Sequence, residues 1–162
     1  AKAIKFPLQG LGSVTDFVVR RVKRSVVGET ITKAHPALKK IAGFIEETSA
    51  EFATTADTLL RRHGREIHLR QFAQKRVADI AIDLYALTCL LSRVTSELER
   101  KGGPEKCELE MAIAESFFMR ASRRVRANFE AMDKNDDALM KLISDQAFER
   151  GGYPYDHILE KK

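Results

Sequence analysis

The chain of 162 residues contains no Trp, two Cys, four Pro and nine Gly. Two cysteines cannot build a disulfide framework, so we expect a reduced protein of the cell interior or of an organelle. Sparse glycine and proline argue against a β-sandwich or barrel, which needs turn signals roughly every 8–12 residues. No apolar run approaches the ~20 residues of a membrane-spanning helix, and no secretory signal opens the chain. Because the first residue is Ala1 and not Met, we expect an excised piece of a longer protein.

Sequence motifs for catalysis and metal binding are also missing. The chain has no glycine-rich phosphate loop and no serine-nucleophile motif. No Glu stands three residues before any His, which excludes a di-iron bundle site, and His63 and His68 are wrongly spaced for a zinc pair. The acidic run from Asp133 to Asp137 lacks the later Gly and Glu of a calcium loop, so we expect a helix start there. We therefore predict no catalytic residue, no cofactor-binding residue and no metal ligand in this chain.

The positive charge is concentrated at the N-terminus. Up to Lys33 the chain carries seven basic and two acidic side chains, which accounts for the whole formal net charge of +5, because the remainder carries 21 of each sign. The candidates for binding an anionic surface are Arg20, Arg21, Lys23 and Arg24. Such a segment suits an acidic partner, whether anionic lipid, nucleic acid or an acidic protein surface. The alternative is a solvated, poorly ordered chain end.

Hydrophobic periodicity predicts helices along most of the chain. Breaks at Gly, Pro and capping residues place them at residues 14–27, 36–63, 66–100, 104–132 and about 135–150. The first is short, basic and amphipathic. The other four, joined by short connections, predict an all-α fold, an antiparallel up-down helical bundle. We divide the chain into a basic N-terminal arm and linker (1–35), the helical bundle (36–152) and an irregular tail (153–162).

The spacing of apolar residues predicts the buried side of each helix. In the longest helix they alternate in steps of three and four, as in a bundle seam, at Val77, Ile80, Leu84, Leu87, Leu91, Val94 and Leu98. For the next helix we expect burial of Leu109, Ile113, Phe117, Val125 and Phe129, and for the last helix of Leu139, Leu142, Ile143 and Phe148. Asp83 flanks the seam, so we expect it to pair with Arg120 or Arg123. Arg76 is the expected partner of Asp79.

One stretch of the longest helix resembles a known family. Residues 71–93 follow the pattern Gln-x-x-x-x-Arg-x-Ala-Asp-x-x-Ile-Asp-Leu-Tyr-Ala-x-x-x-x-Leu-Ser-Arg. This pattern resembles the C-terminal helical extension of very-long-chain acyl-CoA dehydrogenase and of its complex I assembly relative. His35-Pro36 before the first long helix and Glu149-Arg-Gly-Gly152 near the end are also similar. The resemblance is strong over residues 59–95 and weaker but colinear over most of the chain.

The resemblance implies an accessory role and no chemistry in this chain. In that family a flavin-dependent dehydrogenase oxidises long acyl-CoA thioesters at the α,β bond, and the catalytic Glu and the FAD and acyl-CoA sites lie in preceding domains. No residue here matches the catalytic base, so none is assigned. The family's extension is associated with dimer packing and with attachment to the inner membrane face. We therefore expect a parent enzyme that holds FAD, in the bacterial cytoplasm or at the mitochondrial inner membrane and matrix.

A second face of the longest helix lies outside the predicted seam. Ile82, Tyr85 and Cys89 point away from it, and only Asp83 and Thr88 interrupt the apolar run over residues 80–91. A helix that is apolar all round is a buried helix. We expect cover from the N-terminal segment, from the parent dehydrogenase domain or from a second copy, and a homodimer is favoured for any surface left over because isologous pairing is the commonest assembly.

A free-standing interaction module is the alternative function. Its basic arm would then bind anionic lipid or nucleic acid. Nucleic acid is the less favoured partner, because the rest of the chain is neutral and the arginines over residues 120–126 lack the context of a recognition helix.

Overall fold

The computed structural model describes residues 30–152. These contain α2 (Lys39–His63), α3 (Gln71–Lys101), α4 (Glu108–Asp133) and α5 (Asp137–Glu149), with short 3₁₀ helices η1 (Pro36–Leu38), η2 (Gly64–Leu69) and η3 (Pro104–Lys106). The described part has no strand, and the predicted all-α helical fold is confirmed. The predicted helix at residues 14–27, with its four clustered basic side chains, lies outside the described residues, as does the predicted tail at 153–162.

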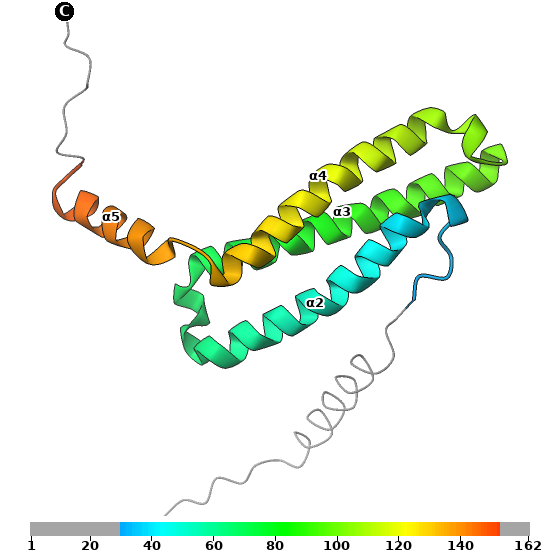
Figure 1. Ribbon diagram of the computed structural model, residues 1–162. Helices are drawn as coiled ribbons and strands as arrows, with labels where there is room; N and C mark the ends of the chain where they lie inside the picture. Colours follow the sequence, from blue (N-terminus) through cyan, green and yellow to red (C-terminus); the bar gives the residue numbers. More distant parts are fainter. Residues whose placement is uncertain (1–29, 153–162) are drawn as a thin grey trace, which may run out of the picture.

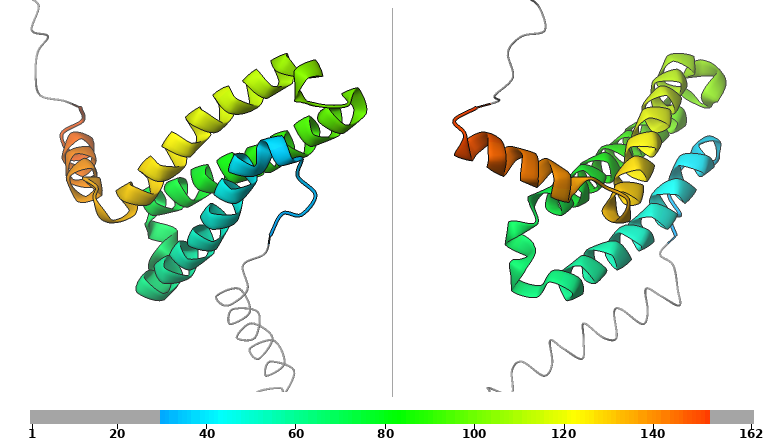
Figure 2. Two further views of the ribbon diagram at one scale, coloured as in Figure 1. Left: turned by 45° about the vertical axis from the view of Figure 1, so that its right-hand side comes forward. Right: turned by 60° about the vertical axis from the view of Figure 1, so that its left-hand side comes forward.

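Three of the helices form an antiparallel up-down bundle (Figure 1). α3 packs against both α2 and α4, and each successive helix runs back along the one before it. α5 does not fold back in this way. After a link over residues 134–136 it extends away from the end of the bundle at which α2 and α4 finish (Figure 2).

Proline and glycine set several helix ends. Pro36 begins η1, and Nδ1 of the preceding His35 accepts a hydrogen bond from the Ala37 amide at 3.2 Å. Gly102 ends α3 in the left-handed region with φ of 85°. The amides of Gly102 and Gly103 both donate to the carbonyl of Leu98 at 2.9 Å, which caps the helix and reverses the chain towards α4. The long helix was expected to start near Glu66, but residues 64–69 form η2 and α3 starts at Gln71.

The core is built on the seam predicted for α3. Six of its seven side chains are at most 8% exposed, namely Ile80, Leu84, Leu87, Leu91, Val94 and Leu98. Val77, at the start of the helix, is half-buried. On the α2 side the core includes Leu38, Ile41, Ile45 and Leu59. The spacing of three and four residues thus predicted the buried row of α3 correctly, because both α2 and α4 pack against that row.

The predicted buried side of α4 is wrong in its first half. Leu109 and Ile113 are 70% and 51% exposed, whereas Phe117 and Phe129 are half-buried. The buried residues are Ala114, Phe118, Ala121, Ser122 and Val125. Three of these five are small, which lets the backbone of α4 approach the core closely. The prediction relied on large apolar residues, and it therefore assigned the buried side of α4 to a face that is rotated from the one buried in the structure.

The prediction that the last helix faces inward is also wrong within this chain. α5 contains no buried residue. Its large apolar side chains are between 47% and 89% exposed, namely Leu139, Met140, Leu142, Ile143 and Phe148. Burial of one such side chain is favourable by about 1.5–3 kcal/mol. Contact of this surface with another apolar surface would therefore be stabilising.

We predict that Leu87→Ala, which truncates a completely buried side chain in the middle of the α3 seam, lowers the free energy of unfolding by about 2–5 kcal/mol. Leu109→Ala is the matched control, since it removes the same atoms from an exposed position on α4. We expect it to change the free energy by less than about 0.5 kcal/mol. Urea unfolding followed by circular dichroism measures both, and equal losses would contradict the corrected face of α4.

Candidate interaction surfaces

The residues expected at an interface lie together on the outward side of α3. Ile82 and Tyr85 are 64% and 74% exposed, and Cys89 carries a free, exposed thiol. Spacings of three and four residues place all three on one face of the helix. Between Asp79 and Arg93 the only charged residue is the buried Asp83. This face, which we call the α3 strip, is therefore uncharged, largely apolar and uncovered by the described part of the chain.

α5 presents a second uncovered apolar surface. Leu139, Leu142 and Ile143 lie on one side of the helix, where spacings of three and four bring their side chains together. On another side Lys141 and Asp145 form an ion pair of 2.7 Å within the helix. This division into an apolar and a charged side is typical of a helix that packs against another protein surface. We call the apolar side the α5 stripe.

One ion pair fixes the base of α5. Arg76 on α3 donates to both carboxylate oxygens of Asp137, with Nη1–Oδ2 at 2.7 Å and Nη2–Oδ1 at 2.5 Å. These hydrogen bonds lower the pKa of Asp137. The sequence had suggested that Arg76 pairs with Asp79, but Lys75 takes that carboxylate at 2.5 Å. Arg76 is thus free to join α3 to α5, although α5 itself buries no side chain.

Asp83 has the kind of partner that was predicted, but not the predicted residue. Arg124 and not Arg120 or Arg123 reaches it, with Nε–Oδ2 at 3.0 Å and Nη2–Oδ1 at 2.5 Å. The Arg124 guanidinium also lies 6.0 Å from the centre of the Phe117 ring. The cause is the same rotation of α4 that exposes Leu109. Because both oxygens of a buried carboxylate are satisfied by one guanidinium, the pair fixes how α4 is turned on α3.

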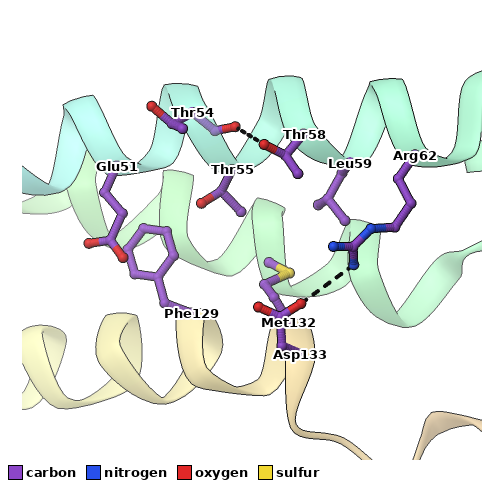
Figure 3. Close-up of a pocket in the computed structure, with 9 residues that line it drawn as sticks. All are labelled: Glu51, Thr54, Thr55, Thr58, Leu59, Arg62, Phe129, Met132 and Asp133. Carbon is purple, nitrogen blue, oxygen red and sulfur yellow. Dashed lines mark hydrogen bonds and ion pairs between the residues drawn. The ribbon is translucent and has the colours of Figure 1, made fainter. Parts of the chain in front are cut away.

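A groove of about 260 Å³ opens between α2 and α4 (Figure 3). It is lined by Glu51, Thr54, Thr55, Thr58, Leu59, Arg62, Phe129, Met132 and Asp133. The hydroxyls of Thr54 and Thr58 donate to carbonyls one turn back in α2, at 3.0 and 2.8 Å. Arg62 crosses the groove to Asp133 at 3.4 Å. Thr54, Thr58, Arg62 and Asp133 are thus bonded within the protein.

Metal-binding side chains do not gather in the described residues either. No group of three or more His, Cys, Asp or Glu side chains in this part of the chain could hold a metal ion. The arrangement offers surfaces for contact and ion pairs that fix helix orientation.

Comparison with known proteins identifies the domain to which these surfaces belong. Residues 36–153 match the family described as ACAD9/ACADV, C-terminal domain. The chain belongs to this family. The match confirms the resemblance seen in residues 71–93, and it makes the chain a C-terminal domain of acyl-CoA dehydrogenase family proteins.

This chain is similar to segments of much longer proteins. It is 28% identical over 159 residues to the very long-chain specific acyl-CoA dehydrogenase, mitochondrial, of Rattus norvegicus, covering 93% of this chain and 24% of that protein. It is 32% identical over 123 residues to the Bos taurus protein of the same name, covering 73% and 18%. It is 27% identical over 134 residues to the probable acyl-CoA dehydrogenase FadE10 of Mycobacterium tuberculosis, covering 80% and 20%. The chain thus spans a quarter or less of these relatives.

None of the helices within residues 30–152 is both long enough and apolar enough to cross a membrane.

We predict that Arg124→Ala destabilises the domain by about 1–3 kcal/mol, because it leaves the buried Asp83 carboxylate without its hydrogen-bond donors. Arg123→Ala is the control, since this neighbouring arginine is exposed and is not the partner of Asp83. Thermal and urea unfolding measure both variants. The structural role given to Arg124 would be wrong if the two variants were equally stable.

The lowered pKa of Asp137 predicts that acid loosens α5. Its carboxylate is bound by Arg76 in the folded chain, so its pKa lies below the ordinary value of about 4. The stabilisation is therefore complete above pH ~4 and is lost as the pH falls through the lowered pKa. ¹⁵N relaxation should show the order parameters of α5 falling there while those of α3 stay high.

Two variants complete this pH experiment. Asp137→Asn should loosen α5 already at neutral pH, because it removes the charge that holds Arg76. Asp145→Asn is the control, since Asp145 pairs only within α5. Rigid α5 amides in Asp137→Asn would show that the ion pair does not hold the helix.

Proposed function

We propose that this domain is an accessory part of an FAD-dependent dehydrogenase that oxidises long-chain acyl-CoA thioesters, and that it serves packing and attachment and not the chemical step. The names of the relatives support this class of parent, because they are acyl-CoA dehydrogenases, including very long-chain specific ones. FAD and the thioester would be held by the parent's other domains. Fatty-acid oxidation is the process that such a parent serves.

The observation that carries the proposal is the α5 stripe. Its three side chains, Leu139, Leu142 and Ile143, are exposed on a helix of 13 residues that buries none of its own. Exposed apolar patches of this kind mark interaction sites in soluble proteins. A domain that completed its own core would have no reason to keep such a helix extended from its end, so we assign the stripe to a partner surface.

The partner proposed for the α5 stripe is the parent dehydrogenase domain. A domain in the same polypeptide is present at a high effective concentration, so a modest apolar contact is enough to hold it. The orientation set by Arg76 and Asp137 would then direct the stripe towards that domain.

For the α3 strip we propose a second copy of the chain. Ile82, Tyr85 and Cys89 form a narrow uncharged row, and two such rows can meet without bringing like charges together. Aromatic side chains such as Tyr85 are enriched in the buried centre of interfaces. A homodimer formed in this way leaves α5, at the end of each bundle, free for the parent domain.

The proposed setting is the bacterial cytoplasm or the mitochondrial matrix, with contact to the inner membrane surface. The family's mitochondrial and bacterial members support either compartment. The basic residues at 20–24 supply the charge for such a contact, since each Lys or Arg near an anionic membrane contributes about 1 kcal/mol. The same charge asymmetry supports the second candidate function, a free-standing module whose arm binds anionic lipid.

The gene and a purified sample distinguish these two functions. We expect the coding sequence upstream of Ala1 to encode a dehydrogenase domain, and we expect the chain of 162 residues to purify without colour. A stoichiometric flavin spectrum in the purified chain would contradict an accessory role. An upstream sequence unrelated to dehydrogenases would favour the free-standing module.

We further predict that Ile82→Asp combined with Tyr85→Ser converts a dimer of the chain into a monomer, because it places charge and polarity in the α3 strip. Leu109→Asp combined with Met119→Ser is the matched control, since it makes the same kind of change at exposed positions of α4. Sedimentation velocity measures the mass of each. A wild-type chain that is monomeric, or a control that dissociates equally, would exclude the α3 strip as the dimer interface.

A further inference from the structure

We propose that two copies of this chain pair antiparallel along α3, in a register that places Lys75 of each copy against Glu99 of the other. This inference rests on the second copy proposed above for the α3 strip, and it adds the direction of the pairing, its register and the residues that determine them. It depends on a row of exposed side chains that is longer than the strip.

The exposed side of α3 repeats as regularly as its buried side. From Lys75 to Glu99 eight positions follow one another in steps of three and four residues, and all eight are exposed. This is the spacing of a second coiled-coil seam, which the described part of the chain leaves uncovered. We call it the outer row, and it consists of Lys75, Ala78, Ile82, Tyr85, Cys89, Ser92, Ser96 and Glu99.

The spacing of the outer row is the same in both directions. Its steps are three, four, three, four, three, four and three, and this order does not change when the helix is reversed. An antiparallel copy can therefore meet every position of the row at the same level. The first position then lies against the last, Ile82 lies against Ser92 of the second copy, and Tyr85 lies against Cys89 of the second copy.

The charges at the two ends of the outer row favour the antiparallel direction. Lys75 is at one end and Glu99 is at the other, and the six positions between them are uncharged. Antiparallel pairing brings a lysine to a glutamate at both ends of the contact. Parallel pairing in register would bring Lys75 to Lys75 and Glu99 to Glu99, and such contacts between like charges disfavour that arrangement.

Both charged side chains are available for this contact. Glu99 is exposed and forms no ion pair within residues 30–152. Lys75 is bonded to Asp79 in its own helix at 2.5 Å, but its side chain is 71% exposed, and an ammonium group has three N–H donors. Lys75 can therefore keep its bond to Asp79 and also donate to the Glu99 carboxylate of a second copy.

The middle of the outer row suits the close approach of two helices. The row spans 24 helical steps, which is about 36 Å, and several of its side chains are small. In this register Ile82 meets the small Ser92, and Tyr85 meets the small Cys89. Because no level sets two large side chains against each other, large and small residues interdigitate along the whole contact.

Charge reversal tests the register. In sedimentation equilibrium of the chain at low salt, we expect Lys75→Glu and Glu99→Lys each to raise the dissociation constant of the dimer about tenfold, because each replaces two attractive contacts by two repulsive ones. The double variant, Lys75→Glu with Glu99→Lys, should return to the wild-type value, since it only exchanges the two charges.

Two matched controls accompany these variants. Lys141→Glu breaks the corresponding ion pair on α5, where Lys141 is bonded to Asp145 one turn away. Glu115→Lys reverses an exposed acid on α4. We expect neither control to change the dissociation constant, because neither residue belongs to the outer row.

Cross-linking gives a second readout of the direction, in a Cys89→Ser background in which the remaining cysteine, Cys107, is buried. Ala78→Cys and Ser96→Cys each add one thiol to the outer row. We expect neither variant alone to form disulfide-linked dimers on mild oxidation, and an equal mixture of the two variants to form them readily. Circular dichroism confirms that the variants remain folded.

The outcomes separate this proposal from the proposed function. Suppose that Ile82→Asp with Tyr85→Ser dissociates the dimer, but that both charge reversals leave it unchanged or Ala78→Cys alone cross-links it. The antiparallel register would then be overturned, and the α3 strip would remain the dimer interface. A monomeric wild-type chain would overturn both the register and the dimer. The accessory role, which the gene and the flavin spectrum test, would stand in either case.

Discussion

The arrangement of this domain depends on one row of aliphatic side chains on α3 that must serve two neighbours at once. Ile80, Leu87 and Leu98 are almost completely inaccessible to solvent because α2 packs against them from one side and α4 from the other. Asp83 lies beside this row, and its two bonds to Arg124 fix the rotation of α4. One side of α3 is buried in the core, and Ile82, Tyr85 and Cys89 on its opposite side are exposed in the described bundle.

The sequence was sufficient to predict the parts of the fold in which large apolar residues are buried. On α3 they alternate without interruption from Ile80 to Leu98, so the seam was found correctly. On α4 the core uses Ala114 and Ala121, and small residues carry little weight in a search for hydrophobic periodicity. The wrong face led directly to the wrong arginine for Asp83, because one residue along a helix turns a side chain by about 100°.

The position of α5 could not be predicted for a different reason. The amphipathic pattern of α5 indicates that Leu139, Leu142 and Ile143 pack against another surface. It does not indicate which surface that is. The sequence analysis assumed that the bundle would bury these side chains because it is the nearest surface. In the structure they are exposed. In the structure α5 is joined to α3 by the ion pair between Arg76 and Asp137, whose residues are 61 positions apart. Periodicity within one helix contains no information about such a contact.

These features together connect the fold with the proposed role. The core of the bundle contains no residue of α5 and none of Ile82, Tyr85 and Cys89 on the outer side of α3. Ile82, Tyr85 and Cys89, which we propose for an interface, are exposed in the single chain, and an interface requires such exposure. Membership of the ACAD9/ACADV C-terminal domain family, in which this chain matches a fraction of longer proteins, supports the proposal that these surfaces contact other parts of a longer protein.

The most direct test of this role is hydrogen exchange, measured by mass spectrometry, on the isolated chain and on the complete polypeptide that contains it. We predict that the amides of α5 exchange at least tenfold more slowly in the complete polypeptide, while those of the α3 seam change little because they are already protected. Equal exchange of α5 in the two samples would contradict the central claim that this helix packs on the parent dehydrogenase domain.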